Sequence, residues 1–275
     1  MVILKTAEHG YLHMMYYMPL LEYLGLLFVG FCAGLLGSFL GVGGGVVVLP
    51  SLVFIFGFRL NVAVGCTVVV VFLNGVISGL MHLFLRNFRL DVFRRVVWVG
   101  VLGSVVGSLL FFAFSRFVWF LSLCLGSYFI YVASRSVYEV VKRPVSSTSK
   151  SRRGIVVYLC GFAAGLVVGL LGMGSGAVLV PLFIYVLDLP AKIAVGTSLL
   201  CFAPMALVSV LFKLAQHSID LLAVACVAPG LVVGARLGSR LLLRAPLRVF
   251  KLVFGIVFLM IGIKFLMNGV AHLAL

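Results

Sequence analysis

Long hydrophobic segments alternate with short polar stretches along almost the whole chain. The segments cover roughly residues 20–41, 44–57, 62–85, 95–114 and 117–138, and then 154–172, 175–187, 191–213, 220–243 and 248–270. A continuous apolar stretch of about 20 residues is long enough to cross a bilayer as a helix. The pattern therefore predicts an all-α polytopic membrane protein, which we expect in the cell (cytoplasmic) membrane with the lipid bilayer as its surroundings.

One strongly polar stretch, KRPVSSTSKSRR at residues 142–153, divides the segments into two groups of five. We expect residues 20–140 to form a first transmembrane repeat and residues 154–275 a second one. A basic linker at 141–153 would join them, and residues 1–19 would form an N-terminal extension.

The two halves match each other at an offset of 131 residues. Of the 21 positions from 30 to 50, 11 are identical to their counterparts in 161–181. The matched stretches include GVGGGVVVLP at 41–50 and GMGSGAVLVP at 172–181. Apolar composition alone would not give this many identities, so the sequence indicates an internal duplication.

The loop charges indicate that the two repeats are inverted relative to each other. Loop 86–95 is strongly basic, whereas its counterpart 214–219 has no Lys or Arg. Conversely, the turn at 115–116 has one Arg and its counterpart 244–251 has three basic residues. Positive residues gather on the cytoplasmic side, so corresponding loops face opposite sides. This arrangement places the linker in the cytoplasm and both termini outside.

Glycine clusters interrupt the apolar runs at Gly41–Gly45 and Gly172–Gly176. The run 20–56 is too short for two crossings, which need about 40 residues. We therefore expect Gly-broken half-helices that meet near the midplane. Their free N–H groups and positive dipole ends favour an anion. For Gly30/Gly34 and Gly161/Gly165, close helix packing is the favoured interpretation.

Polar residues occur at matching places near the breaks and in the third segment of each half. The candidate substrate-binding residues are Gly41, Gly43, Gly44, Gly45, Thr67, Asn74, Gly172, Gly174, Ser175, Gly176, Thr197 and Ser198. Each hydroxyl has an alternative role, a bond to a carbonyl of its own helix. The candidate helix breaks or hinges are Pro50 and Pro181.

A candidate anion funnel comprises His82, Lys213 and Arg236, although snorkelling to the membrane interface accounts for each of them more simply. The net charge of +15 reflects basic loops, and nothing indicates a nucleic-acid partner. The carboxylates lie at segment ends or in loops, namely Glu8, Glu22, Asp91, Glu139, Asp188 and Asp220. This distribution argues against a cation site and against a carboxylate proton relay. Scattered His and Cys residues predict no metal site, no cofactor and no membrane enzyme.

The matched strings GFCAGLLGSFLGVGGGVVVLP and GFAAGLVVGLLGMGSGAVLVP, followed by AVGCT and AVGTS, resemble the TauE/SafE sulfite-exporter family. This family is also called the toluene sulfonate uptake permease family. The resemblance covers nearly the whole chain beyond about residue 24 and extends to His82 and Asp220. Lys213 replaces the usual His, and Arg89 stands where an Asp would be.

The resemblance implies a transporter, and specifically an exporter, of small sulfur-containing anions such as sulfite or organosulfonates. The residues by themselves indicate only a small anion. We expect alternating access at the interface of two inverted repeats. An anion channel and a carrier for another small anionic metabolite are the alternatives, and a homo-oligomer is left open.

Overall fold

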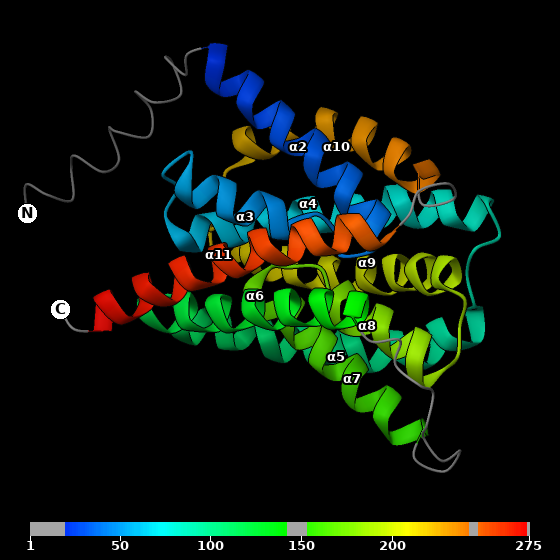
Figure 1. The fold of residues 1–275 in the computed structure, drawn as a ribbon. Helices are drawn as coiled ribbons and strands as arrows, with labels where there is room; N and C mark the ends of the chain where they lie inside the picture. Colours follow the sequence, from blue (N-terminus) through cyan, green and yellow to red (C-terminus); the bar gives the residue numbers. More distant parts are fainter. Residues whose placement is uncertain (1–19, 142–152, 242–246, 274–275) are drawn as a thin grey trace, which may run out of the picture.

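The structure, a computed structural model, describes residues 20–141, 153–241 and 247–273. The first half contains α2 (Leu20–Leu40), α3 (Gly45–Phe54), α4 (Leu60–Phe84), α5 (Leu90–Phe114) and α6 (Val118–Val141). The second contains α7 (Arg153–Leu171), α8 (Gly176–Pro181), the π-helix η1 (Leu182–Val186), α9 (Ala191–Ala215), α10 (Leu221–Leu241) and α11 (Leu247–Leu273). All regular elements in these ranges are helical, which confirms the all-α prediction (Figure 1).

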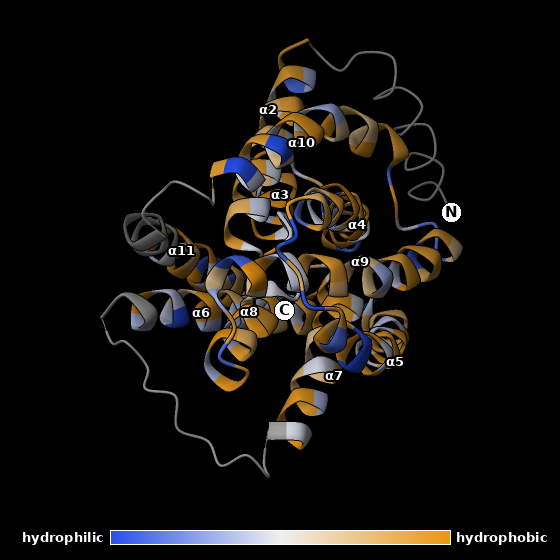
Figure 2. Ribbon diagram, turned by 90° about the vertical axis from the view of Figure 1, so that its right-hand side faces the viewer, coloured by the Kyte–Doolittle hydropathy of each residue, from blue (hydrophilic) through white to orange (hydrophobic). Residues whose placement is uncertain are grey.

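Seven of the described helices are long and apolar enough to cross a membrane. Large apolar side chains such as Phe28, Trp98, Leu159 and Met260 are exposed on the outside of the bundle. Figure 2 shows predominantly hydrophobic helices, with the more hydrophilic residues toward helix ends and connections. A surface of this kind is stable against lipid tails, so the chain is a multi-pass membrane protein. The predicted extension 1–19 and linker residues 142–152 lie outside the described ranges.

The two halves repeat the same backbone turns. Positive φ angles recur at the 131-residue offset in three pairs, namely Gly41 (72°) and Gly172 (67°), Gly57 (67°) and Asp188 (53°), and Arg86 (55°) and His217 (50°). A positive φ is uncommon for residues other than glycine. Its recurrence at Asp188, Arg86 and His217 therefore reflects a shared local structure rather than shared composition.

Helices of one half pack mainly against helices of the other. The most extensive contacts join α2 to α10, α5 to α7, α6 to α11 and α4 to α9. Figure 2 shows α4 and α9 in the middle, with the α2–α10 and α5–α7 pairs on opposite sides of them. In each of these two outer pairs, the first helix of one half meets the fourth helix of the other.

Glycines allow the outer pairs to approach closely. A Cβ atom on Gly30 would overlap the carbonyl oxygen of Val227, and one on Gly34 would overlap that of Leu231. On α7, a Cβ atom on Gly165 would likewise overlap the carbonyl oxygen of Gly100. The packing interpretation of these glycine pairs is therefore confirmed at Gly30, Gly34 and Gly165.

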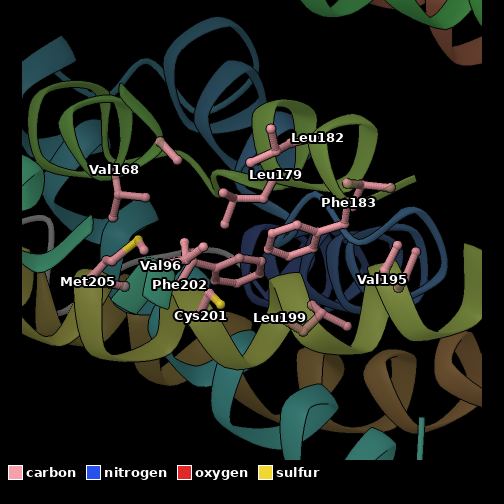
Figure 3. Packing of buried hydrophobic residues seen from close by; sticks show 14 of the residues in the cluster. Val96, Val168, Leu179, Leu182, Phe183, Val195, Leu199, Cys201, Phe202 and Met205 are labelled. Atoms are coloured by element: carbon pink, nitrogen blue, oxygen red, sulfur yellow. The ribbon is translucent and has the colours of Figure 1, made fainter. Parts of the chain in front are cut away.

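A continuous apolar core surrounds the central helices. Phe183 of η1 and Phe202 of α9 are fully buried in one cluster with residues of α4, α5, α7 and α8 (Figure 3). Met205 extends this cluster along α9. The core fixes the short helices α8 and η1 against α9, and thereby positions the second glycine break.

Candidate functional site

Both helices break at the predicted glycines. α2 ends at Leu40 and α3 begins at Gly45, so residues 41–44 are non-helical. Gly41, Gly43 and Gly44 have φ angles of 72°, 87° and 76°. Glycine adopts these left-handed angles without steric cost, whereas other residues are strained there. The second break separates Leu171 from Gly176.

The helices that follow the breaks are too short to cross a bilayer. α3 has 10 residues, and α8 with η1 spans Gly176–Val186. At about 1.5 Å per residue, each covers roughly half of a 30 Å hydrocarbon core. Figure 1 shows α3 and α8 leaving the centre of the molecule in opposite directions. They are half-helices whose N-terminal ends lie at the centre.

The two prolines do not produce the breaks. Pro50 lies inside α3, which continues to Phe54. Pro181 is the last residue of α8, where the α-helix changes to the π-helix η1. The interruptions therefore lie at the glycine-rich residues 41–44 and 172–175, and a helix-break or hinge role for the prolines stays a prediction.

The two breaks cross in direct backbone contact. A Cβ atom on Gly174 would overlap the carbonyl oxygen of Val42, and one on Gly176 would overlap that of Gly41. All residues of both breaks are buried. We call this contact region, residues 41–45 and 172–176, the crossing. The two backbones touch there and leave no space between them.

A small cavity lies beside the crossing. Its volume is about 60 Å³, and its lining includes Val42, Gly176 and Ala177 from the crossing and the helix after it. Arg135 and Ser136 of α6 complete its polar lining. One water needs about 10–15 Å³ on this scale, so the cavity has room for several waters or a small anion.

Thr67 and Ser198 flank the crossing from α4 and α9. The methyl group of Thr67 lies against Gly45, while its hydroxyl donates to the Ala63 carbonyl at 2.6 Å. The Ser198 hydroxyl donates to its own helix at 2.8 Å and lies 3.5 Å from the Gly41 carbonyl oxygen. Both hydroxyls thus satisfy a carbonyl of their own helix, as the alternative interpretation predicts.

Thr197 has a different environment from Ser198. Its hydroxyl donates to the Ile193 carbonyl at 2.7 Å and accepts the backbone N–H of Arg89 at 3.1 Å. The corresponding contact in the first half joins the Cys66 sulfur to the Asp220 N–H at 3.3 Å. Thr197 therefore holds a loop to the start of α9, and the structure does not bring it to the crossing.

Asn74 offers a hydrogen-bond donor beside the first break. Its Oδ1 atom accepts the hydroxyls of Ser38 at 3.0 Å and Ser78 at 3.1 Å, and these two hydroxyls also contact each other. Its Nδ2 group is buried, has no partner among the described residues and lies next to Gly37 and Gly44. An unpaired buried donor is costly, so this group suits a ligand with acceptor oxygens.

Ser175 is the corresponding feature of the second break. Its hydroxyl is buried and has no partner within the described part of the chain. Beside it, the Tyr128 hydroxyl donates to the Gly174 carbonyl at 3.0 Å and fixes the break to α6. An unpaired polar group thus lies beside the first break, on Asn74 of α4, and another lies within the second, on Ser175. The contribution of Tyr128 depends on contact between distant segments, and no sequence signal identifies it.

Two residues of the candidate anion funnel, Lys213 and His82, are fully buried. The Lys213 ammonium group donates to the Gly169 carbonyl at 2.8 Å and lies 3.7 Å from the centre of the Phe111 ring. His82 has no partner for either ring nitrogen among the described residues. The Lys213 side chain points into the protein rather than toward the membrane interface, which argues against simple snorkelling.

The three residues of the predicted funnel are not brought together. His82 lies beside Gly196, near the start of α9, whereas Lys213 lies in its last turn. Arg236 is exposed on α10. No Asp or Glu among the side chains that the structure describes is buried, and those residues contain no cluster of metal-binding side chains.

The helical bundle and its paired half-helices define a multi-pass membrane protein with a break at the centre of each half. The family described as "Sulfite exporter TauE/SafE" matches residues 26–265. Because this match covers most of the chain, the protein belongs to the TauE/SafE family and is a membrane transporter.

Similar proteins come from bacteria and archaea. "Probable membrane transporter protein YunE" of Bacillus subtilis is 27% identical over 89% of this chain and 97% of its own length. "Probable membrane transporter protein MJ0441" of Methanocaldococcus jannaschii is 32% identical over 63% of this chain and 65% of its own length. No solved structure matches the chain.

Proposed function

We propose that the protein carries small sulfur-containing anions, such as sulfite or organosulfonates, by alternating access at the crossing. The observation that carries this proposal is the direct contact of two broken helices at the centre of the bundle. The first N–H groups of a helix have no partner within that helix and attract anions. The family description adds sulfite as the example substrate.

The polar groups around the crossing support an anion rather than a cation. Asn74 Nδ2 and the Ser175 hydroxyl supply one unpaired polar group at each break. No carboxylate among the described residues is buried beside them. Because the breaks touch, an anion reaches these groups only when the two halves move apart, and this requirement favours a carrier over an open pore.

The opposite directions of corresponding helices support alternating access. In Figure 1, α2 begins at the upper left and α7 begins at the lower right, so the first helices of the two halves run in opposite directions. Rocking one half against the other would then expose the crossing to each side in turn. The basic residues of the loops and of the linker further support our proposal of a cytoplasmic linker in a protein of the cell membrane.

The Ser175→Ala variant tests this function. Purified protein is heated with sulfite, thiosulfate, sulfate, taurine, sulfoacetate or chloride, and uptake is measured in proteoliposomes. We expect stabilisation and saturable uptake for the sulfur anions. Since the Ser175 hydroxyl bonds no described protein group, its removal should weaken anion affinity about tenfold without lowering the melting temperature of the ligand-free protein.

The matched control is Ser108→Ala, which removes another buried, unpaired hydroxyl from α5. This control should bind anions as the wild type does. Equal affinity in both variants would contradict the site, and stabilisation by cations alone would contradict the function. Uptake that never saturates would identify the channel alternative instead.

A further inference from the structure

Each half-helix ends beside a cation supplied by the last helix of the opposite half. Arg135 of α6 lies over the ring of Tyr185 at the end of η1, 5.4 Å from the ring centre. Lys264 of α11 lies over the ring of Phe54 at the end of α3, 4.2 Å from its centre. Cations are attracted to the faces of aromatic rings, so these contacts hold both side chains in defined places.

The two contacts occupy similar places in the duplicated fold. Phe54 and Tyr185 are separated by the 131-residue offset of the repeats, and Arg135 and Lys264 depart from that offset by only two residues. Since α3 and α8 leave the crossing in opposite directions, the two cations lie on opposite sides of it (Figure 1). A contact of this kind is thus repeated at the ends of both half-helices.

Arg135 also lines a cavity that touches the crossing. The lining of this cavity of about 60 Å³ includes both the guanidinium-bearing Arg135 and two residues of the crossing, Val42 and Gly176. An anion held in this cavity would therefore lie near both the Arg135 side chain and the breaks. A guanidinium group binds oxyanions with paired N–H donors, and an ammonium group attracts them as a point charge.

We propose that Arg135 and Lys264 are the anion-capture residues of the transporter, one for each side of the membrane. Arg135 receives oxyanions from the side on which α8 ends, and Lys264 receives them from the side on which α3 ends. The aromatic ring holds each cation at the entrance to its half-helix. This assignment rests on the proposed anion transport.

The test measures anion uptake from each side separately, in right-side-out and inside-out vesicles from cells that express the full chain. Arg135→Gln should raise the KM for sulfite about tenfold on one side only, because one charged contact is lost there. Lys264→Gln should do the same on the other side. Arg135→Lys retains the charge but not the paired donors, so its KM should be intermediate.

Exposed basic residues elsewhere provide the controls. Arg94→Gln in α5 and Arg116→Gln in the turn after it each remove one exposed charge that takes no part in the two ring contacts, and both should keep the wild-type KM on both sides. If the wild type transports sulfite and Arg135→Gln matches these controls, the capture role is overturned while the proposed function stands. Equal KM changes on both sides would overturn the sidedness. If the wild type moves no sulfur anion, the proposed function itself fails, and the capture role fails with it.

Discussion

Asn74 shows how one side chain can be both a structural group and a candidate ligand group. Its Oδ1 atom is committed to Ser38 and Ser78, which fixes the orientation of the amide. The Nδ2 group is thereby held beside Gly44 with no described partner. Sequence spacing singles out Asn74 as polar and intramembrane, but only the fold shows which of its two ends is occupied.

An Asn74→Asp variant should abolish anion transport. The substitution replaces the free donor with an acceptor that repels an anion and is costly to bury when ionised. We expect at least a tenfold loss of uptake in proteoliposomes. Asn61→Asp is the matched control, because Asn61 lies near the start of the same helix and uses its Oδ1 atom to accept the Val62 N–H at 3.0 Å. Retained transport by Asn74→Asp would remove Asn74 from the site.

At the scale of elements, the half-helices depend on glycine for two separate reasons. Gly43 and Gly44 adopt positive φ angles. Gly176 is needed because two backbones touch there and leave no room for a side chain. The sequence predicts both breaks, because several glycines within five residues strongly disfavour a continuous helix. It does not predict that the breaks close on each other, since that contact joins segments more than 130 residues apart.

A Gly176→Ala variant should destabilise the protein. Its Cβ atom would overlap the Gly41 carbonyl oxygen, and backbone cannot yield as a flexible side chain does. Overpacking of this kind typically costs about 1–3 kcal/mol. We therefore expect a lower melting temperature and less monodisperse protein in detergent. Gly154→Ala, where an added Cβ meets nothing within 4 Å, is the control and should be neutral. A stable Gly176→Ala variant would show that the crossing opens readily.

At the scale of the whole molecule, the duplication can be predicted from the sequence. The packing of helices of one half on helices of the other half cannot. Identities at the 131-residue offset indicate two equivalent units. Nothing in the sequence places α2 on α10 or α5 on α7, because the apolar faces of all these helices are chemically alike. Thr197 and Ser198 are adjacent polar residues, so the sequence assigns them the same role. Only the fold distinguishes them, through the contact between Thr197 and the backbone of Arg89.

The proposed inversion of the two halves makes a direct prediction about equivalent loops. Arg86 and His217 are exposed residues with positive φ in the connections after α4 and α9. In a variant without the six native cysteines, Arg86→Cys and His217→Cys should react with a membrane-impermeant thiol reagent from opposite sides. Arg94→Cys should share the side of Arg86→Cys. Labelling of Arg86→Cys and His217→Cys from the same side would contradict the inversion.

The packing of helices of one half on helices of the other half also has a consequence for biosynthesis of the protein. Gly34 of α2 packs on Leu231 of α10, about 200 residues later in the chain. At roughly 5–20 residues per second, the ribosome needs about 10–40 s to supply that partner. During this interval the glycine-lined face of α2 has no protein to pack against, whereas α7 finds α5 already synthesised. The N-terminal half is therefore the part of the chain most exposed to misassembly and proteolysis during biogenesis.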